Sequence, residues 1–423
     1  MPVWLKIGLL SFGGPAGQIA LMHRILVDEK RWIDDTRFLQ GLNFCMLLPG
    51  PEAQQLATYI GWRLNGIAGA AAAGLLFIAP GALVIFALSA LYVAFRDLPA
   101  IDGVFLGVRA AVIAVVVEAL LRVSKRALKS RAAVAVAGAA FVAIFAFQAP
   151  FPLIIAAAAL TGLLAARAGR VWFAAPTVAV AAAPDVSLRA GLTAAAVCAA
   201  LWAAPVAALL IFAGPDHIFT TQAIFFSKMA VVTFGGAYAV LAYVAQQAVE
   251  TFGWLAPGEM IDGLGLAETT PGPLVLVLQF VGFVGAAKAE TGLPPLVAGL
   301  IGGAIALWMT FAPCFLWIFL GGPFIDRLSR AKAAASALAA VTAAVVGVIL
   351  NLTVWFAAHA LFAEVGEARA GALVVLAPDP ASFHWPSAVI AAAALVAVFR
   401  FHVGVLVLIA ASAAAGIAMT YFL

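Results

Sequence analysis

Apolar runs of about 20 residues recur along almost the whole chain, each long enough to cross the roughly 30 Å of hydrocarbon in a bilayer as a helix. Hydrophobic residues make up 65% of the chain and charged residues only 10%, so no stretch is polar enough to form a soluble domain of its own. Backbone polar groups within lipid must be satisfied inside each segment. We therefore predict an all-α polytopic protein of the cytoplasmic (inner) membrane.

Several functional classes are disfavoured by what the sequence lacks. No GxxxxGK[ST] motif is present, which argues against a pump driven by ATP bound to this chain. The cysteines Cys45, Cys198 and Cys314 lie in apolar segments without a CxxC spacing, so we expect neither disulfides nor a metal site, and no cofactor. The net charge of +4 is small and dispersed, and a nucleic-acid partner is not expected.

The second part of the chain repeats the first. The shift that carries Lys6 onto Lys228 also superposes residues of several distinct types. These are FGG 12–14 on FGG 234–236, Trp32 on Trp254, Gly41-Leu42 on Gly263-Leu264, and PGP 49–51 on PGP 271–273. Shared hydrophobicity alone would not produce such matches. We predict a first transmembrane repeat at 1–168, a linker at 169–219 with one connecting helix, and a second repeat at 220–423.

The positively charged loops predict that the two repeats are inverted. Residues 122–131 and 326–332 are rich in Lys and Arg and are expected in the cytoplasm, whereas the acidic loop 363–385 is expected outside. An odd number of crossings separates the repeats. The loop 23–37 is basic but its counterpart 247–257 contains no Lys or Arg, which favours opposite sides and re-entrant hairpins. Helices that cross fully and are broken in the middle remain the alternative.

The FGG and PGP motifs each interrupt a helix at membrane depth. Proline removes a backbone N–H and glycine leaves the backbone exposed, so neither motif readily continues a helix. Lipid cannot satisfy the freed groups, and matched interruptions in two inverted halves indicate a substrate site near the midplane. Half-helix N-termini present N–H groups and partial positive charge, which favours an anion. The alternative is that the motifs serve only helix packing and a kink.

We expect the anion to be bound by the glycines and prolines of these turns, by hydroxyls beside them, and by two lysines at equivalent positions. The candidates are Lys6, Ser11, Gly13, Gly14, Pro49, Gly50, Pro51, Lys228, Thr233, Gly235, Gly236, Thr269, Thr270 and Gly272. The lysines are alternatively snorkelling residues or ion-pair partners of Glu52 or Glu268. These glutamates flank the PGP motifs and are candidates for proton coupling or for helix caps. Arg109 and Glu118, in one apolar segment, are read as structural as readily as functional.

Five segments carry a resemblance to a known family. They are FGGPAGQIALMH (12–23), LLPGPEAQQLATYIGWRLNGIAG (47–69), FIAPG (77–81), TFGGAYAVLAYV (233–244) and GLGLAETTPGP (263–273). In combination they resemble the chromate ion transporter family in its long-chain form, built of two homologous halves, over essentially the full length. The chain departs from the family pattern at Gly17-Gln18, where members often have a histidine, and at Ala237, where the second copy lacks a proline. A titrating group at position 18 is therefore in doubt.

The resemblance implies a secondary transporter that exports chromate, a tetrahedral oxyanion similar to sulfate, and is not an enzyme. Nothing in composition or spacing identifies chromium, so sulfate uptake or exchange is the first alternative, and sulfate is kept as a second candidate partner. A membrane-embedded enzyme is the other alternative, but no HExxH, paired-aspartate or nucleophile-elbow motif lies at membrane depth. The direction of transport, the coupling ion and a homodimeric state are left open.

Overall fold

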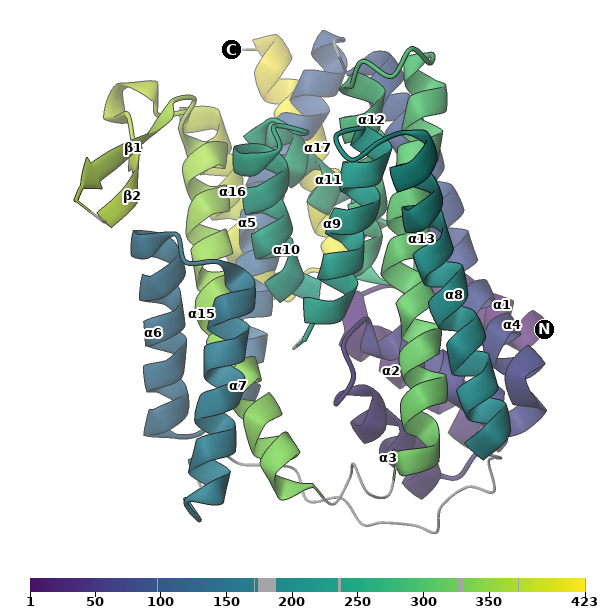
Figure 1. Ribbon diagram of the computed structural model, residues 1–423. Helices are drawn as coiled ribbons and strands as arrows, with labels where there is room; N and C mark the ends of the chain where they lie inside the picture. Colours follow the sequence, from purple (N-terminus) through teal and green to yellow (C-terminus); the bar gives the residue numbers. More distant parts are fainter. Residues whose placement is uncertain are drawn as a thin grey trace. The chain divides into compact units, whose positions relative to one another are not determined.

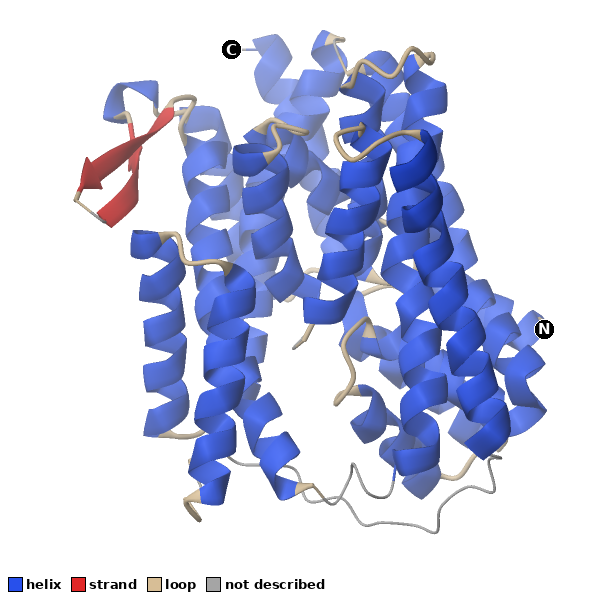
Figure 2. Ribbon diagram, in the orientation of Figure 1, coloured by secondary structure: helices blue, strands red, loops and turns tan. Residues whose placement is uncertain are grey.

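The computed structural model describes residues 1–96, 98–170, 172–173, 188–234, 237–325, 331–371 and 373–422. Within these ranges the chain is helical apart from connecting turns and one small hairpin of strands (Figure 2). The fold class predicted from the sequence is confirmed. The chain divides into two compact units, each assembled from three separate segments, and each is described by itself.

The first unit contains Met1–Ala90, Ala175–Val240 and Thr270–Ala335. Its elements are α1 (Pro2–Leu10), α2 (Gly14–His23), η1 (Arg24–Glu29), α3 (Asp35–Cys45), most of α4 (Glu52–Phe95), α8 (Leu188–Phe212), α9 (Ile218–Val232), η3 (Leu274–Leu276), α12 (Val277–Lys288), α13 (Pro295–Gly321) and η4 (Gly322–Phe324). The long helix α13 packs along α8, α9 and α12 (Figure 1). This unit holds all of the FGG and PGP motifs.

The second unit contains Leu91–Ala174, Leu241–Thr269 and Ser336–Leu423. Its elements are α5 (Pro99–Ala127), α6 (Arg131–Phe147), α7 (Phe151–Arg167), most of α10 (Ala237–Ala245), η2 (Gln246–Thr251), α11 (Pro257–Thr269), most of α15 (Lys332–Leu361), β1 (Val365–Ala370), β2 (Leu373–Pro378), η5 (Pro380–Ser382), α16 (Trp385–Phe401) and α17 (Val405–Phe422). Helix α5 packs against α16 and α17, and α6 and α7 lie beside α15 (Figure 1).

Among the described residues, five helices are long and apolar enough to cross a membrane. They cover Glu52–Phe95, Ile101–Ala127, Leu188–Phe212, Pro295–Phe324 and Lys332–Leu361. Shorter apolar helices, among them α6, α7, α9, α16 and α17, accompany them. The sequence-based prediction of a polytopic membrane protein is therefore confirmed. The residue limits proposed for the repeats and the linker stay a prediction, although α8 is a helix in the region expected to connect the repeats.

The predicted breaks in the helices are present at the first FGG motif and at both PGP motifs. Helix α1 ends at Leu10 and α2 begins at Gly14, and the intervening Gly13 has a φ of +83° that favours glycine. At the two PGP motifs the chain is also non-helical, and Gly50 and Gly272 have φ angles of +123° and +98°. Gly235 and Gly236 of the second FGG lie outside the described residues.

Each half also contains a pair of helices that meet through glycines. Within α4 the helix geometry fails at Asn65 and Gly66, and the two arms pack so closely that a Cβ on Gly61 would lie 2.4 Å from the carbonyl oxygen of Gly69. In the second half α12 and α13 make the same contact, with a Cβ on Gly282 falling 2.6 Å from the oxygen of Gly302. Only a residue without a side chain allows this approach. The repetition of the contact agrees with two homologous halves.

The loop 363–385 folds as more than the polar connection that the sequence predicted. Strands β1 and β2 pair antiparallel from Val365 opposite Pro378 to Ala370 opposite Leu373. Six-residue strands with few β-branched residues give a weak sequence signal, and a two-stranded hairpin depends on its contacts for stability. The hairpin contacts α6 within its own unit.

Candidate functional site

Each PGP turn is hydrogen-bonded to the residue before the FGG motif of the other half. The N–H of Gly50 donates to the carbonyl oxygen of Thr233 at 2.8 Å, and the N–H of Gly272 donates to the carbonyl oxygen of Ser11 at 2.7 Å. Gly50 and Gly272 are equivalent in the repeats, as are Ser11 and Thr233. The two bonds are therefore related by the internal symmetry, and within the first unit they join each PGP turn to the residue that precedes the FGG motif of the other half.

The side chain of Gln18 forms a second hydrogen bond to the second PGP turn. Its Nε2 donates to the carbonyl oxygen of Gly272 at 2.6 Å, and the side chain is buried. Gly272 thus has both its N–H and its carbonyl bound by the segment that contains the first FGG motif. This role of Gln18 was not predicted from the sequence, where the position was noted only as a possible titrating group. Its departure from the usual histidine was the one signal that singled it out.

The long helix that follows each PGP turn packs against the PGP turn of the other half, and the contact leaves no space for larger residues. A Cβ on Gly81, in the second arm of α4, would lie 2.1 Å from the carbonyl oxygen of Pro271. On the other turn, a Cβ on Gly50 would lie 2.9 Å from Sγ of Cys314 in α13. Gly81 and Cys314 each follow a proline inside a long helix. The two turns are therefore tightly packed, the second through its backbone and the first against a side chain.

Two helix N-termini at this site lack a side-chain cap. Helix α2 begins after Gly13 and η3, which leads into α12, begins after Pro273, and neither N-cap residue accepts a hydrogen bond from the helix. Their first N–H groups have no partner within the helix and carry partial positive charge. A Cβ on Gly13 or Gly14 would meet no atom within 4 Å. The start of α2 therefore has open space beside it, where an anion can approach the backbone.

The hydroxyls proposed as ligands are engaged with their own helices. Ser11 Oγ donates to the carbonyl oxygen of Ile7 at 2.6 Å, and the Thr233 hydroxyl donates to that of Met229. Thr269 Oγ1 donates in the same way to Leu266 at 2.8 Å. These bonds satisfy carbonyl groups at the helix ends. As placed, the three hydroxyls offer an anion no free hydrogen, and their role as ligands stays a prediction.

The two lysines lie on exposed faces. Lys6 in α1 and Lys228 in α9 are exposed, whereas their neighbours Ile7 and Met229 are buried. The symmetry of the two positions is kept, but the side chains do not lie in the buried region where the turns meet. Their part in anion binding stays a prediction.

The remaining candidates lie at the ends of helices. Glu52 is half-buried in the first turn of α4, where a carboxylate interacts favourably with the helix dipole. Glu268 is half-buried near the end of α11, and Thr270, directly before the second PGP motif, is buried. A role of either glutamate as a helix cap or as an ion-pair partner of a lysine stays a prediction. Proton coupling by either glutamate is untested.

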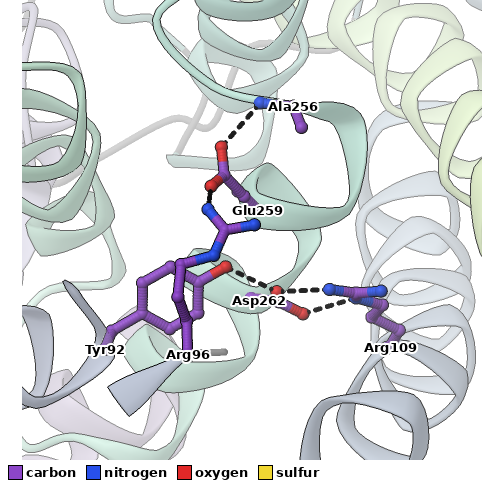
Figure 3. Close-up of polar contacts among 6 residues, drawn as sticks. All are labelled: Tyr92, Arg96, Arg109, Ala256, Glu259 and Asp262. Atoms are coloured by element: carbon purple, nitrogen blue, oxygen red, sulfur yellow. Dashed lines mark hydrogen bonds and ion pairs between the residues drawn. The ribbon is translucent and has the colours of Figure 1, made fainter. Parts of the chain in front are cut away.

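The second unit contains a cluster of charged residues that was not predicted from the sequence. Asp262 of α11 is fully buried and accepts a bidentate bond from Arg109 of α5, with Nε to Oδ1 at 2.6 Å and a terminal nitrogen to Oδ2 at 2.7 Å (Figure 3). The Tyr92 hydroxyl donates to Oδ2 at 2.9 Å. Beside them, Arg96 forms an ion pair with the buried Glu259 (Figure 3). The cluster joins α4 and α5 to α11, the helix that leads along the chain into the second PGP motif.

Interrupted helices from two homologous halves that meet at one place are typical of membrane transporters. Residues 1–163 and 220–417 match the family described as chromate transporter. The chain belongs to this family, which is one of transporters rather than enzymes.

Curated relatives agree with this assignment. The chain is 37% identical over 360 residues to a chromate transport protein of Pseudomonas aeruginosa, covering 83% of this chain and 79% of that protein. It is 30% identical over 358 residues to a chromate transport protein of Cupriavidus metallidurans, covering 85% and 82%. A probable chromate transport protein of Synechococcus elongatus is 28% identical over 355 residues. No solved structure matches the chain.

Proposed function

We propose that the protein exports chromate across the cytoplasmic membrane as a secondary transporter and thereby gives chromate resistance. The observation that carries the proposal is the pair of symmetric hydrogen bonds from Gly50 to Thr233 and from Gly272 to Ser11. These bonds gather interrupted backbone from both halves at one place, and the uncapped start of α2 adds N–H donors beside open space. Such a site selects an anion by its charge and its size, which suits a tetrahedral dianion.

The membrane potential supports outward movement. Moving one elementary charge across a potential of about 100 mV corresponds to roughly 2.3 kcal/mol, so a dianion leaving a negatively charged cytoplasm gains about 4.6 kcal/mol. Export therefore needs no ATP, in keeping with the absence of a phosphate-binding loop on this chain. Entry of the same dianion would require a coupled ion. Glu52 and Glu268 are the groups we propose for proton coupling if the protein works in that direction.

The mechanism follows from the interlocked turns. The anion binds to the N–H groups at the start of α2 and η3, where the dipoles are fixed before it arrives and little reorganisation is required. The two halves then rock about the contacts between the PGP turns and the opposite FGG segments, which exposes the site to either side in turn. Because Gly272 is bound through Ser11 and Gln18, movement of one half is transmitted directly to the turn of the other.

The direct test is chromate efflux from proteoliposomes that contain the purified protein. With a potential negative inside, we expect chromate to leave faster than from protein-free vesicles and to remain chemically unchanged. External sulfate tests the alternative substrate. Exchange of sulfate without any movement of chromate would contradict the proposal, and chemical conversion of chromate without transport would favour an enzyme.

Gly14→Val tests the site itself. Gly14 has a φ of +72° and open space beside it, and a branched side chain would fill the space through which the anion reaches the backbone. Gly214→Val is the matched control, since Gly214 also has a positive φ of +88° and no atom within 4 Å of its Cβ position. We expect Gly14→Val to abolish efflux while the control keeps it. Equal efflux from the two variants would exclude the start of α2 as the anion site.

A further inference from the structure

An apolar groove runs between α6 and α7 in the second unit. Its volume is about 310 Å³, and its walls include Ala139 and Ala143 of α6 and Ala157 and Thr161 of α7, with Ala344 of α15 at its floor. The hydroxyl of Thr161 donates to the carbonyl oxygen of Ala157 at 2.8 Å, so its hydrogen is not available to an occupant. The groove exists because small side chains face each other where two consecutive helices separate.

The depth of the groove determines what can fill it. Helices α6 and α7 have 17 residues each, about 25 Å of helix. The wall residues lie in the middle of each helix and toward the end that is farther from Arg131 and Arg167. At this depth the surroundings are hydrocarbon, and water would find almost no hydrogen-bond partner in an alanine-lined space. An empty groove would forfeit the dispersion contacts of its walls. The occupant is therefore itself apolar along this stretch.

A basic cluster lies at one end of the same two helices. Arg131 begins α6 and Arg167 ends α7, and because the helices are antiparallel these residues lie at the same end. Arg170 follows α7, and its guanidinium lies 4.9 Å from the ring centroid of Trp172. The connecting segments are joined there by a bond of 2.6 Å from Ser130 Oγ to the Trp172 carbonyl oxygen.

Among the residues that the structure describes, no carboxylate pairs with the arginines of this cluster. Arg131, Arg167 and Arg170 are exposed, and none forms an ion pair within the described part of the chain. The sequence predicts that this end faces the cytoplasm. A cluster of exposed arginines on that side suits an anionic headgroup, and an exposed tryptophan beside it is typical of the interface.

We propose that this face binds an anionic phospholipid, with an acyl chain in the groove and the phosphate at the arginine cluster. The spacing agrees with one molecule occupying both features. At the nearest part of the groove, Val136 lies five positions after Arg131 and Thr161 lies six positions before Arg167, which corresponds to about 7 to 9 Å along the helices. That interval places the glycerol region between the headgroup and the acyl chain.

A second copy of the chain suits the face less well than a lipid. In a membrane, a symmetric dimer has its twofold axis along the membrane normal, so equivalent ends of both copies lie in the same leaflet. Contact through this groove would bring two arginine clusters together without counter-charges. Like charges in such a setting repel, whereas a lipid phosphate neutralises them.

The test measures lipid binding to the purified full-length protein in detergent. Phosphatidylglycerol and phosphatidylcholine are titrated separately, and the retained lipid is counted by native mass spectrometry. We expect phosphatidylglycerol to bind at least about tenfold more tightly, because each basic residue near the surface contributes roughly 1 kcal/mol to anionic lipid binding. Equal binding of the two lipids would overturn the proposal.

Two sets of variants separate the headgroup from the groove. Neutralising the cluster with Arg131→Gln, Arg167→Gln and Arg170→Gln together should remove the preference for phosphatidylglycerol. Arg189→Gln, which neutralises an exposed cation at the start of α8 outside the cluster, should keep it. Unchanged preference in the triple variant would refute the headgroup site.

The groove is filled by Ala139→Leu with Ala157→Leu, both exposed wall positions. The matched control is Ala135→Leu with Ala156→Leu, which are exposed on the same helices but do not line the groove. We expect the wall variants alone to lose bound phosphatidylglycerol. Loss of a dimer with lipid binding retained would instead identify the groove as an interface between copies and overturn the proposal.

Discussion

The bond from Gln18 to the second PGP turn provides the sharpest test of the site. Gln18→Leu keeps the side chain close in volume but removes the donor that lies 2.6 Å from the carbonyl oxygen of Gly272. Leaving a buried carbonyl without its donor costs about 1 to 3 kcal/mol. When this bond stabilises the conformation of the turn that binds the anion, losing it lowers chromate affinity by about 5- to 150-fold.

Gln222→Leu is the control for a loss of stability alone. Gln222 is also buried, and its Nε2 donates to a backbone carbonyl, that of Gly282, at 3.0 Å. Gly282 lies nine residues beyond the second PGP motif, about 14 Å along the chain if all of it were α-helix. The two variants therefore remove bonds of the same type, but only one of these bonds is made to a PGP turn.

The assay compares chromate binding and efflux with thermal unfolding of the same purified variants. We expect similar decreases in melting temperature and a decrease in chromate affinity only for Gln18→Leu. Equal affinity in both variants would refute the reasoning, because the bond to Gly272 would then stabilise the fold without shaping the anion site.

Three further predictions concern the lysines, the packing of the turns and pH. Lys6→Met or Lys228→Met should weaken oxyanion binding by at least about tenfold, roughly 1.4 kcal/mol, with arginine rescuing only in part; wild-type binding by both methionine variants would show that the lysines only snorkel. Gly81→Ala should lower stability by about 1 to 3 kcal/mol and impair efflux, because its Cβ would lie 2.1 Å from the Pro271 oxygen; an unchanged melting temperature would contradict this. Glu250 lies outside the membrane-spanning helices, and burial raises the pKa of its carboxyl group. The folded state therefore binds the proton more tightly than the unfolded state, so this group's contribution to the free energy of unfolding is complete below the unfolded-state pKa and is lost as pH rises through the folded-state pKa. Glu250→Gln should therefore remove the part of the fall in melting temperature with rising pH that this carboxyl group causes. If the melting temperature of the variant depends on pH as that of wild type does, the assignment is refuted.

The sequence predicted the breaks in the helices because their cause is local. Glycine and proline act on their own backbone, and Gly50 and Gly272 adopt positive φ angles at the motifs where helices were expected to end. The repeat likewise follows from residue identities alone. The partners of the turns did not follow, because Ser11 and Gly272 are far apart in the chain and no local pattern records which carbonyl receives a given N–H.

Buried polar contacts over long separations were the other part that the sequence could not predict. Arg109 was recognised as a charge in an apolar segment, but its partner Asp262 lies 153 residues further along the chain. Asp262 lies in the moderately polar helix α11, directly before the segment GLGLAETTPGP, and nothing in the sequence marked it as a partner of Arg109. Pairing of this kind is decided by the packing of α5 against α11, which depends on the whole second unit.

The Arg109–Asp262 pair leads to a prediction about how α11 is held. Asp262 is fully buried and receives three hydrogen bonds, two from Arg109 and one from Tyr92, so its negative charge is compensated on both oxygens. Removing one member of a buried pair typically costs about 3 to 5 kcal/mol, because the other charge is left uncompensated. Loss of the neutral Tyr92 hydroxyl should cost less, about 1 to 3 kcal/mol, since the arginine still binds the carboxylate.

We therefore expect Asp262→Leu and Arg109→Met each to unfold at clearly lower temperature than wild type, and the double variant to be more stable than either single one. An isolated charge in the core costs more than two apolar side chains of similar size in its place. The measurement is a double-mutant cycle of melting temperatures, with Tyr92→Phe as the control for a lost neutral bond. Strictly additive effects would show that the pair does not act as a unit. Because α11 leads directly into the second PGP motif, a double variant that is stable but does not transport chromate would mean that this pair also fixes the position of the turn.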